Sequence, residues 1–206
     1  MEVPVTTTTP LQPLKVKCTS SDCERGLHCF LTTKKLEEQN LRGACRSCGA
    51  QLIDWPRLHS RQVADIEYTF VSLRQELIRH HFAHVPLQPE AIDYARRKGW
   101  RGLEEAVIKR LKVAIGPESP FHDGFQTPRE DSKNPIHYAQ HGTATCCRRC
   151  LQEWYGIPLG VELQPSELRY FAGLVVRFLR ERLPEVTEEG EHVPRRRPIP
   201  SDAEEV

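Results

Sequence analysis

The residues with the most definite chemistry in this sequence are eight cysteines, which gather in two groups. The first group contains two closely spaced pairs, Cys18 with Cys23 and Cys45 with Cys48. Paired thiolates at such spacings supply the four soft ligands that tetrahedral zinc prefers. We therefore predict that these four cysteines hold one zinc ion. His28 and Cys29 lie between the pairs, and either can replace a member of the first pair.

The second group lies in the stretch HGTATCCRRC, which spans residues 141–150. Cys147 and Cys150 form another closely spaced pair, and His141 precedes them across a turn of small residues that lets its imidazole fold back. Cys146 and His137 compete for the fourth position. We predict a second metal site formed by His141, Cys146, Cys147 and Cys150, and so about two zinc ions per chain.

The composition of the chain limits its class and its partners. The chain has 206 residues, 38% of them hydrophobic and 28% charged, with a net charge of +1. A net charge this close to zero does not by itself predict a charged partner, so any basic surface has to be local. The first residues show no signal-peptide pattern, and no later stretch approaches the roughly 20 apolar residues of a membrane span. We expect a cytoplasmic protein without membrane association, whose reduced cysteines bind metal rather than form disulfides.

Changes in composition divide the chain into four parts. Residues 1–14, rich in Thr and Pro, are predicted to be a flexible N-terminus, and residues 185–206, rich in charge and Pro, a disordered tail. Residues 15–58 combine the first cysteine group with glycines and few apolar runs, which is typical of a small zinc-ribbon-like module. Residues 59–184 are predicted to form a helical domain around the second metal site. The expected fold class is mainly α with a small N-terminal zinc-ribbon-like β module, an α+β protein stapled by metal.

Helical periodicity marks the elements that position the second site. Apolar residues recur at helical spacing over residues 61–81, and this helix is predicted to leave Arg74, Glu76 and Arg79 in water. Further helices are predicted over residues 89–99, 103–115 and 165–183, with Gly99 ending the first of them. Residues 116–145 look irregular and are predicted to form a long functional loop.

Three stretches of the C-terminal half resemble a known family: DGFQTP, NPIHYAQHGTATCCRRCLQEWYGIPLG and LQPSELRYFAGLVVRFLRERLP. The resemblance is to uncharacterised bacterial proteins that share a domain of unknown function with the pattern AQHATATCCRxCLxxWHxIPxG. It covers residues 123–184, and it implies membership of that family without implying a function. Two positions depart from the pattern, Gly142 in place of alanine and Tyr155 in place of histidine. If that histidine binds metal or acts in catalysis, this protein lacks the group.

Basic side chains near the predicted turns point to a partner. They are Arg96, Arg97, Lys98 and Arg101 beside one helix end, and Arg148 and Arg149 inside the second metal knuckle. Side chains held on a rigid metal-bound turn are suited to phosphate contact, and Trp100 and Tyr155 can add base stacking. We therefore predict a binding protein whose leading partner is nucleic acid.

Two other functions remain open. A metal-dependent hydrolase or nuclease can be built from the loop residues His122, Asp123, His137 and His141, provided that the metal keeps an open position. If four protein ligands close the second site, this possibility falls. A zinc-stapled adaptor for another protein is the third interpretation, because exposed zinc knuckles also serve as docking surfaces.

Overall fold

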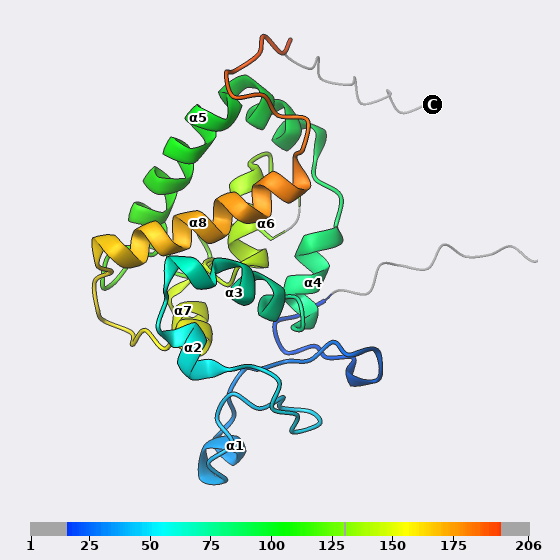
Figure 1. Ribbon diagram of the computed structural model, residues 1–206, viewed down its shortest axis with the longest axis vertical. Coiled ribbons are helices and arrows are strands. Elements are labelled where there is room, and N and C mark those ends of the chain that lie inside the picture. The colour runs from blue at the N-terminus through cyan, green and yellow to red at the C-terminus, as the bar shows by residue number, and fades with distance from the viewer. Residues whose placement is uncertain (1–15, 130, 195–206) are drawn as a thin grey trace, which may run out of the picture.

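The computed structural model describes residues 16–129 and 131–194 of the chain, which are built mainly from helices (Figure 1). The elements in chain order are η1 (Cys23–Arg25), α1 (Lys34–Glu38), α2 (Trp55–His59), η2 (Val63–Asp65), α3 (Ile66–Leu73), α4 (Leu77–His84), α5 (Pro89–Ala114), α6 (Pro135–Gly142), α7 (Arg148–Tyr155) and α8 (Pro165–Arg182). The predicted flexible N-terminus, residues 1–14, lies outside the described residues.

The described residues contain no β-strand, only two isolated bridges, one between Asp22 and Leu27 and one between His28 and Glu76. The prediction of a mainly helical protein is confirmed, and that of an N-terminal β module is wrong. Residues 16–54, called here the N-terminal lobe, fold through turns, η1 and the short helix α1. Between Phe30 and Cys45 the chain forms α1 and turns, so this segment does not pair as strands.

Helix α8 forms the centre of the helical domain, and α3, α5 and α6 pack against it (Figure 1). It begins at Pro165, as predicted, behind a capping box in which the side chains of Gln164 and Glu167 accept from each other's backbone amides. Its buried residues include Tyr170, Phe171, Leu174, Val175, Phe178 and Leu179. They belong to one hydrophobic core that also contains residues of the N-terminal lobe. Within the described part of the chain, no helix has both the length and the apolar character needed to cross a membrane.

The single helix predicted over residues 61–81 is broken in two, because the chain becomes extended at Glu76 (φ −92°, ψ 126°). His28 of the N-terminal lobe pairs with this break. Its N–H donates to the Gln75 carbonyl at 2.7 Å, and its carbonyl accepts from the Leu77 N–H at 2.9 Å. Glu76 and Arg79, both expected in water, are only 2% and 3% exposed. The prediction assumes one continuous helix through residue 76, and such a helix would place these two charged side chains on its solvent-facing side.

Helix α5 contains the two helices predicted over residues 89–99 and 103–115, joined at a kink at Gly99 (φ 62°, ψ 173°). The C-terminal segment crosses this kink, where the Trp100 N–H donates to the Thr187 carbonyl at 2.9 Å (Figure 1). A Cβ at position 99 would lie 2.4 Å from the Glu189 carbonyl carbon, so glycine permits the close approach. Val186 is buried. The tail predicted to be disordered from residue 185 therefore packs against α5 over residues 186–191, and residues 195–206 lie outside the described residues.

Residues 116–145, predicted to be an irregular loop, contain helix α6. Asn134 begins it, with a side chain that accepts from the Ile136 N–H, and Pro135 occupies its first turn. The helix packs against α4 and α8. At its end, a Cβ on Gly142 would come 2.2 Å from the Phe178 ring, so this departure from the alanine of the resembled pattern makes room for that ring. A helix of 8 residues is too short to show a clear helical period in the sequence.

Three aromatic rings dock the N-terminal lobe on α7. Phe30 meets Trp154 edge-on at 5.7 Å and Trp55 at 5.9 Å, and the two indoles lie 5.4 Å apart. The Thr32 N–H also donates to the Glu153 carboxylate at 3.1 Å. Because these rings belong to the same core as α8, the lobe and the helical domain share one interior.

Candidate metal centres

The first cluster comprises Cys23, His28, Cys45 and Cys48, whose ligand atoms all lie within 4.8 Å of one another. The Sγ atoms of Cys23 and Cys45 are 3.7 Å apart, and Sγ of Cys48 lies 3.5 Å from Nδ1 of His28. Cys18, predicted as a ligand here, is not part of this cluster, and His28 stands in its place. Three thiols and one imidazole form a donor set that fits a tetrahedral metal ion.

Two glycine turns shape the first cluster. Gly26 (φ 72°) ends η1, which begins at Cys23, and returns the chain toward His28. Gly49 (φ 75°) closes the turn that carries the second pair of thiols, and its N–H donates to the Cys45 carbonyl at 2.8 Å. Both φ values lie in the left-handed region that glycine adopts without strain, so these turns bring the ligands together at little cost.

Backbone amides prepare one thiol of the first cluster to bind a cation. Burial raises the pKa of Cys45, but the amides of Cys29, Cys48 and Ser47 outweigh it and lower that pKa to about 6. Burial and the neighbouring thiols of Cys48 and Cys45 raise the pKa of Cys23 to about 12. One thiolate is thus present at neutral pH, and a bound cation would be needed to deprotonate Cys23.

The second cluster comprises Cys146, Cys147 and Cys150, whose Sγ atoms lie within 4.8 Å of one another. Cys147 is the N-cap residue of α7, and Cys150 lies in the first turn of that helix, with its Sγ 3.5 Å from that of Cys146. Asp123 holds the start of α7, because its carboxylate accepts from the Arg148 N–H at 3.0 and 3.2 Å. The positive end of the helix dipole favours thiolates at this place.

The thiols of the second cluster differ in acidity. Donation from the Cys146 and Cys150 thiols lowers the pKa of Cys147 to about 3, with burial acting in the opposite direction. The Cys147 and Cys150 thiols, together with burial, raise the pKa of Cys146 well above its ordinary value. The cluster therefore carries negative charge in a largely buried place, and a metal cation would neutralise it.

His141, the predicted histidine ligand, is not part of the second cluster. Its Nε2 lies 3.2 Å from the carbonyl oxygens of Thr127 and Pro128, and its ring stacks on Phe82 at 4.5 Å. His141 lies in the last turn of α6, ahead of the turn of small residues, and the helix directs its ring toward this loop instead of toward the thiols. His137, the alternative ligand, lies outside the cluster as well.

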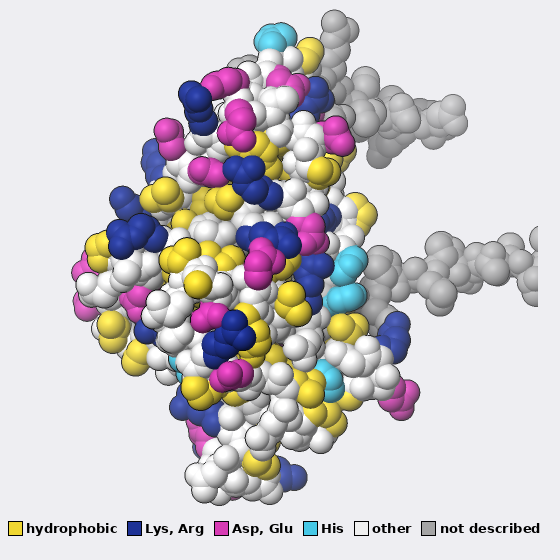
Figure 2. Space-filling view, in the orientation of Figure 1, with side chains coloured by type: hydrophobic (Ala, Val, Ile, Leu, Met, Phe, Trp, Pro, Cys, Tyr) yellow, Lys and Arg dark blue, Asp and Glu magenta, His cyan; other side chains and the backbone are white. Residues whose placement is uncertain are grey.

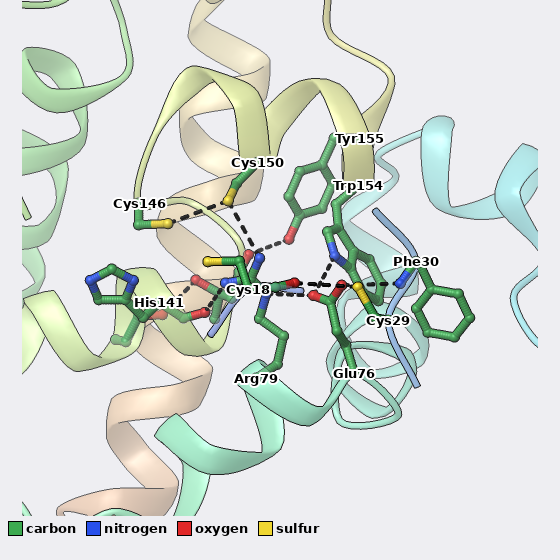
Figure 3. Close-up of polar contacts among 12 residues, drawn as sticks. Cys18, Cys29, Phe30, Glu76, Arg79, His141, Cys146, Cys150, Trp154 and Tyr155 are labelled. Atoms are coloured by element: carbon green, nitrogen blue, oxygen red, sulfur yellow. Dashed lines mark hydrogen bonds and ion pairs between the residues drawn. The ribbon is translucent and has the colours of Figure 1, made fainter. Parts of the chain in front are cut away.

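A buried ion pair supports the second cluster (Figure 3). Arg79 donates from Nε to Glu76 at 2.9 Å, from Nη1 to the His141 carbonyl at 2.7 Å and from Nη2 to Sγ of Cys150 at 3.4 Å. Glu76 also accepts from the Trp154 indole N–H at 2.9 Å. Sequence reasoning missed this pair. The signal that could have found it is the three-residue spacing of opposite charges on a helix.

Arg148 does not reach solvent, contrary to its predicted role in phosphate contact. It is 1% exposed, and its guanidinium donates to the carbonyls of Ile115, Pro158 and Val161 at 2.6 to 2.9 Å. The residue is the first of α7, and the helix directs its side chain into the interior rather than along an exposed knuckle. Arg148 therefore joins loops inside the protein.

The predicted basic group at the kink of α5 is exposed, and it comprises Arg96, Arg97, Lys98 and Arg101. Two of its members form ion pairs with the C-terminal segment, Arg96 with Glu191 at 2.8 Å and Arg101 with Glu189 at 2.9 Å. The group lies apart from α7, which carries the exposed Arg149 (Figure 1). On the face drawn in Figure 2, Lys and Arg side chains are interspersed with Asp and Glu. The predicted basic residues thus do not gather on one surface.

The loop residues considered for a hydrolase do not converge. Asp123 caps α7, His122 is exposed, and Nδ1 of His137 lies 2.8 Å from Oγ of Ser132. Among the residues that the structure describes, the two clusters are the only groups of three or more Cys, His, Asp or Glu residues whose ligand atoms come this close together. Tyr155, where the resembled pattern has histidine, is buried and donates to a backbone carbonyl rather than facing a metal.

A comparison with known proteins identifies one matching family. The family described as Domain of unknown function (DUF4186) matches residues 67–180, which is more than half of the chain. The match runs from α3 to α8, so it includes the second cluster and excludes the first. No solved structure matches the chain.

Proposed function

Since the chain belongs to the DUF4186 family, whose description assigns no activity, we propose its function from the two clusters: the protein binds two zinc ions. The observation that carries this proposal is the convergence of ligand atoms within 4.8 Å of one another at two places, sulfurs with one imidazole nitrogen in the first cluster and sulfurs alone in the second. Thiolates with an added imidazole favour zinc over the hard cations magnesium, calcium and manganese.

The two ions have a structural role in this proposal. The first cluster already supplies four protein ligands, which leaves no open position for a substrate or a reactive water. Its ligands come from separate turns of the N-terminal lobe, so an ion there ties the lobe together. The second cluster lies where the chain enters α7, beside the buried Arg79, and an ion there fixes that entry. At the first site, binding rather than catalysis follows from this closed set of four ligands.

The purified protein is expected to contain about two zinc ions per chain, one for each cluster. Elemental analysis after purification under reducing, zinc-replete conditions measures this. Cys45→Ser should lower the content to about one ion, because a structural site rarely survives the loss of a ligand. Cys29→Ser is the matched control and should keep both ions, since Cys29 lies outside both clusters. A parent protein without zinc would overturn the proposal.

A second candidate function is nucleic-acid binding beside the second cluster. Phe121 and Phe125 are 82% and 89% exposed on a loop that Asp123 fixes to the start of α7. Arg149, also exposed, lies in the first turn of that helix. Aromatic rings stack on bases and arginine contacts phosphate, so this combination suits a single strand better than a duplex.

Single-stranded oligonucleotides are expected to bind, with Phe125→Ala weakening binding by about 1–3 kcal/mol through lost stacking. Arg149→Ala should also flatten the plot of log affinity against log salt, by about 0.7 for one phosphate contact. Fluorescence anisotropy with labelled mixed-sequence strands at several salt concentrations measures both effects.

Arg97→Ala is the matched control for this binding, because Arg97 is an exposed arginine at the kink of α5, away from the loop. It should bind as the parent does. Binding that none of these variants changes would place the contact elsewhere. If the parent binds no strand at low salt, nucleic-acid binding is excluded. The exposed phenylalanines would then be expected to contact a protein partner.

A further inference from the structure

The second cluster offers three thiols, whereas a structural zinc site takes four protein ligands. The fourth must come from a side chain that the fold brings near the cluster and that can still turn toward it. We compare two of the residues predicted as metal ligands, His141 and Cys18. The question rests on the proposed zinc binding, because without an ion no fourth ligand is needed.

The N-terminal end of the described chain runs beside α4 instead of staying within the lobe (Figure 1). The Val16 carbonyl accepts from Nη2 of Arg129 at 2.7 Å, in the loop that leads to α6. The Cys18 carbonyl accepts from Sγ of Cys29 at 3.3 Å. The backbone around Cys18 is therefore fixed between the lobe and the helical domain, while its side chain remains exposed.

Arg79 is the neighbour that Cys18 shares with the second cluster. Cys18 lies close enough to the Arg79 guanidinium to interact with its charge, as Cys150, Glu76 and Cys146 do. In Figure 3 the Cys18 thiol lies on the side of Arg79 that faces Cys146 and Cys150. Rotation of the Cys18 side chain is thus the movement that would bring a fourth thiolate to the cluster.

His141 is less able to complete the site. Its Nε2 is held between the Thr127 and Pro128 carbonyls, both at 3.2 Å, and its ring stacks on Phe82. The ring cannot move toward the thiols without giving up these buried contacts, whereas the exposed Cys18 thiol can rotate. We propose that Cys18 is the fourth ligand of the second zinc site, so that four thiolates from two distant parts of the chain hold the ion.

The charge around the second cluster suits four thiolates. A zinc ion with four thiolate ligands is a net anion, and a buried anion needs cations or N–H donors facing it. Arg79 is a buried cation whose Nη2 already lies 3.4 Å from Sγ of Cys150. The ion would also tie the segment around Cys18, which lies outside the family match, to the domain that the family defines.

Cadmium-113 NMR tests the assignment, because each site gives its own resonance and the resonance moves upfield when a thiolate is lost. In Cys18→Ser the second-site resonance should move and the first-site resonance should stay. Zinc competition with a chelator should show binding at least about tenfold weaker at one site, since even outer partners contribute 10–100-fold. Cys18→His should recover much of this loss, and Cys29→Ser is the matched control with both resonances unchanged.

The outcomes separate this inference from the proposed function. A parent protein that binds no metal overturns the zinc-binding function and the role of Cys18 with it. If the parent shows two resonances and Cys18→Ser changes neither, zinc binding stands and the assignment of Cys18 is wrong. A change at the first site instead returns Cys18 to the first cluster. A second-site change in His141→Gln, with none in Cys18→Ser, makes His141 the fourth ligand.

Discussion

Chelation of zinc is expected to unfold the N-terminal lobe while α8 stays protected. The buried apolar residues of the lobe are Cys29, Phe30, Leu36, Ala44, Cys45 and Ile53. So small a core does not offset the ordering entropy of the lobe, about 1–2 kcal/mol per residue. A structural zinc ion contributes about 10–16 kcal/mol, which is comparable to the whole stability of a typical domain, about 5–15 kcal/mol.

Hydrogen exchange with and without a zinc chelator at constant pH measures this effect. The amides of residues 23–50 should lose protection first, and added zinc should restore it. Cys45→Ser should reproduce the chelated state of the lobe even when zinc is present, because it removes a ligand of the first cluster. Full protection of the lobe after the metal has been shown to leave would contradict a structural role for the ion.

Arg79→Met is expected to lower the free energy of unfolding by about 3–5 kcal/mol, the usual effect of removing one partner of a buried ion pair. Glu76, 2% exposed, would lose its cationic partner, and the His141 carbonyl would lose a donor at 2.7 Å. The Cys150 sulfur would lose its contact with Nη2 as well. Denaturant unfolding of the metal-loaded protein measures the change.

Two controls show whether the buried pair causes this loss. Arg149→Met removes an exposed arginine from the start of α7, beside the second cluster, and should change stability by less than about 0.5 kcal/mol. The double variant Glu76→Gln with Arg79→Met should be less damaging than the two single changes added together, because no buried charge is left unpaired. Equal unfolding midpoints for Arg79→Met and Arg149→Met would show that the pair contributes little.

Glu76 also connects the two clusters. Its side chain binds Arg79, which contacts Cys150 of the second cluster. Its backbone forms a bridge with His28, which is a member of the first cluster. The break between α3 and α4 is therefore the place where the lobe, the helical domain and both clusters meet. Changes at Glu76 should disturb both sites, whereas a change on the outer face of α5 should disturb neither.

The sequence by itself determined the features that depend on neighbouring residues. Two residues separate Cys45 from Cys48 and Cys147 from Cys150, and thiols so spaced can meet across a tight turn, so these two pairs could be predicted as parts of the clusters. The start of α8 at Pro165 followed from its apolar period and its proline. The helix α6 and the absence of strands from residues 16–54 could not be predicted, because segments as short as eight residues carry little periodic signal.

Only the tertiary structure decided which distant residues complete these sites. His28 enters the first cluster in place of Cys18 because the lobe docks on the break at Glu76, a contact between segments far apart in the chain. The same break buries Arg79, which periodicity placed in water, and α7 buries Arg148, which its position beside the cysteines placed on the surface. Side-chain type and spacing predict what a residue can bind. The packing of one element on another determines which groups it meets and whether it faces water.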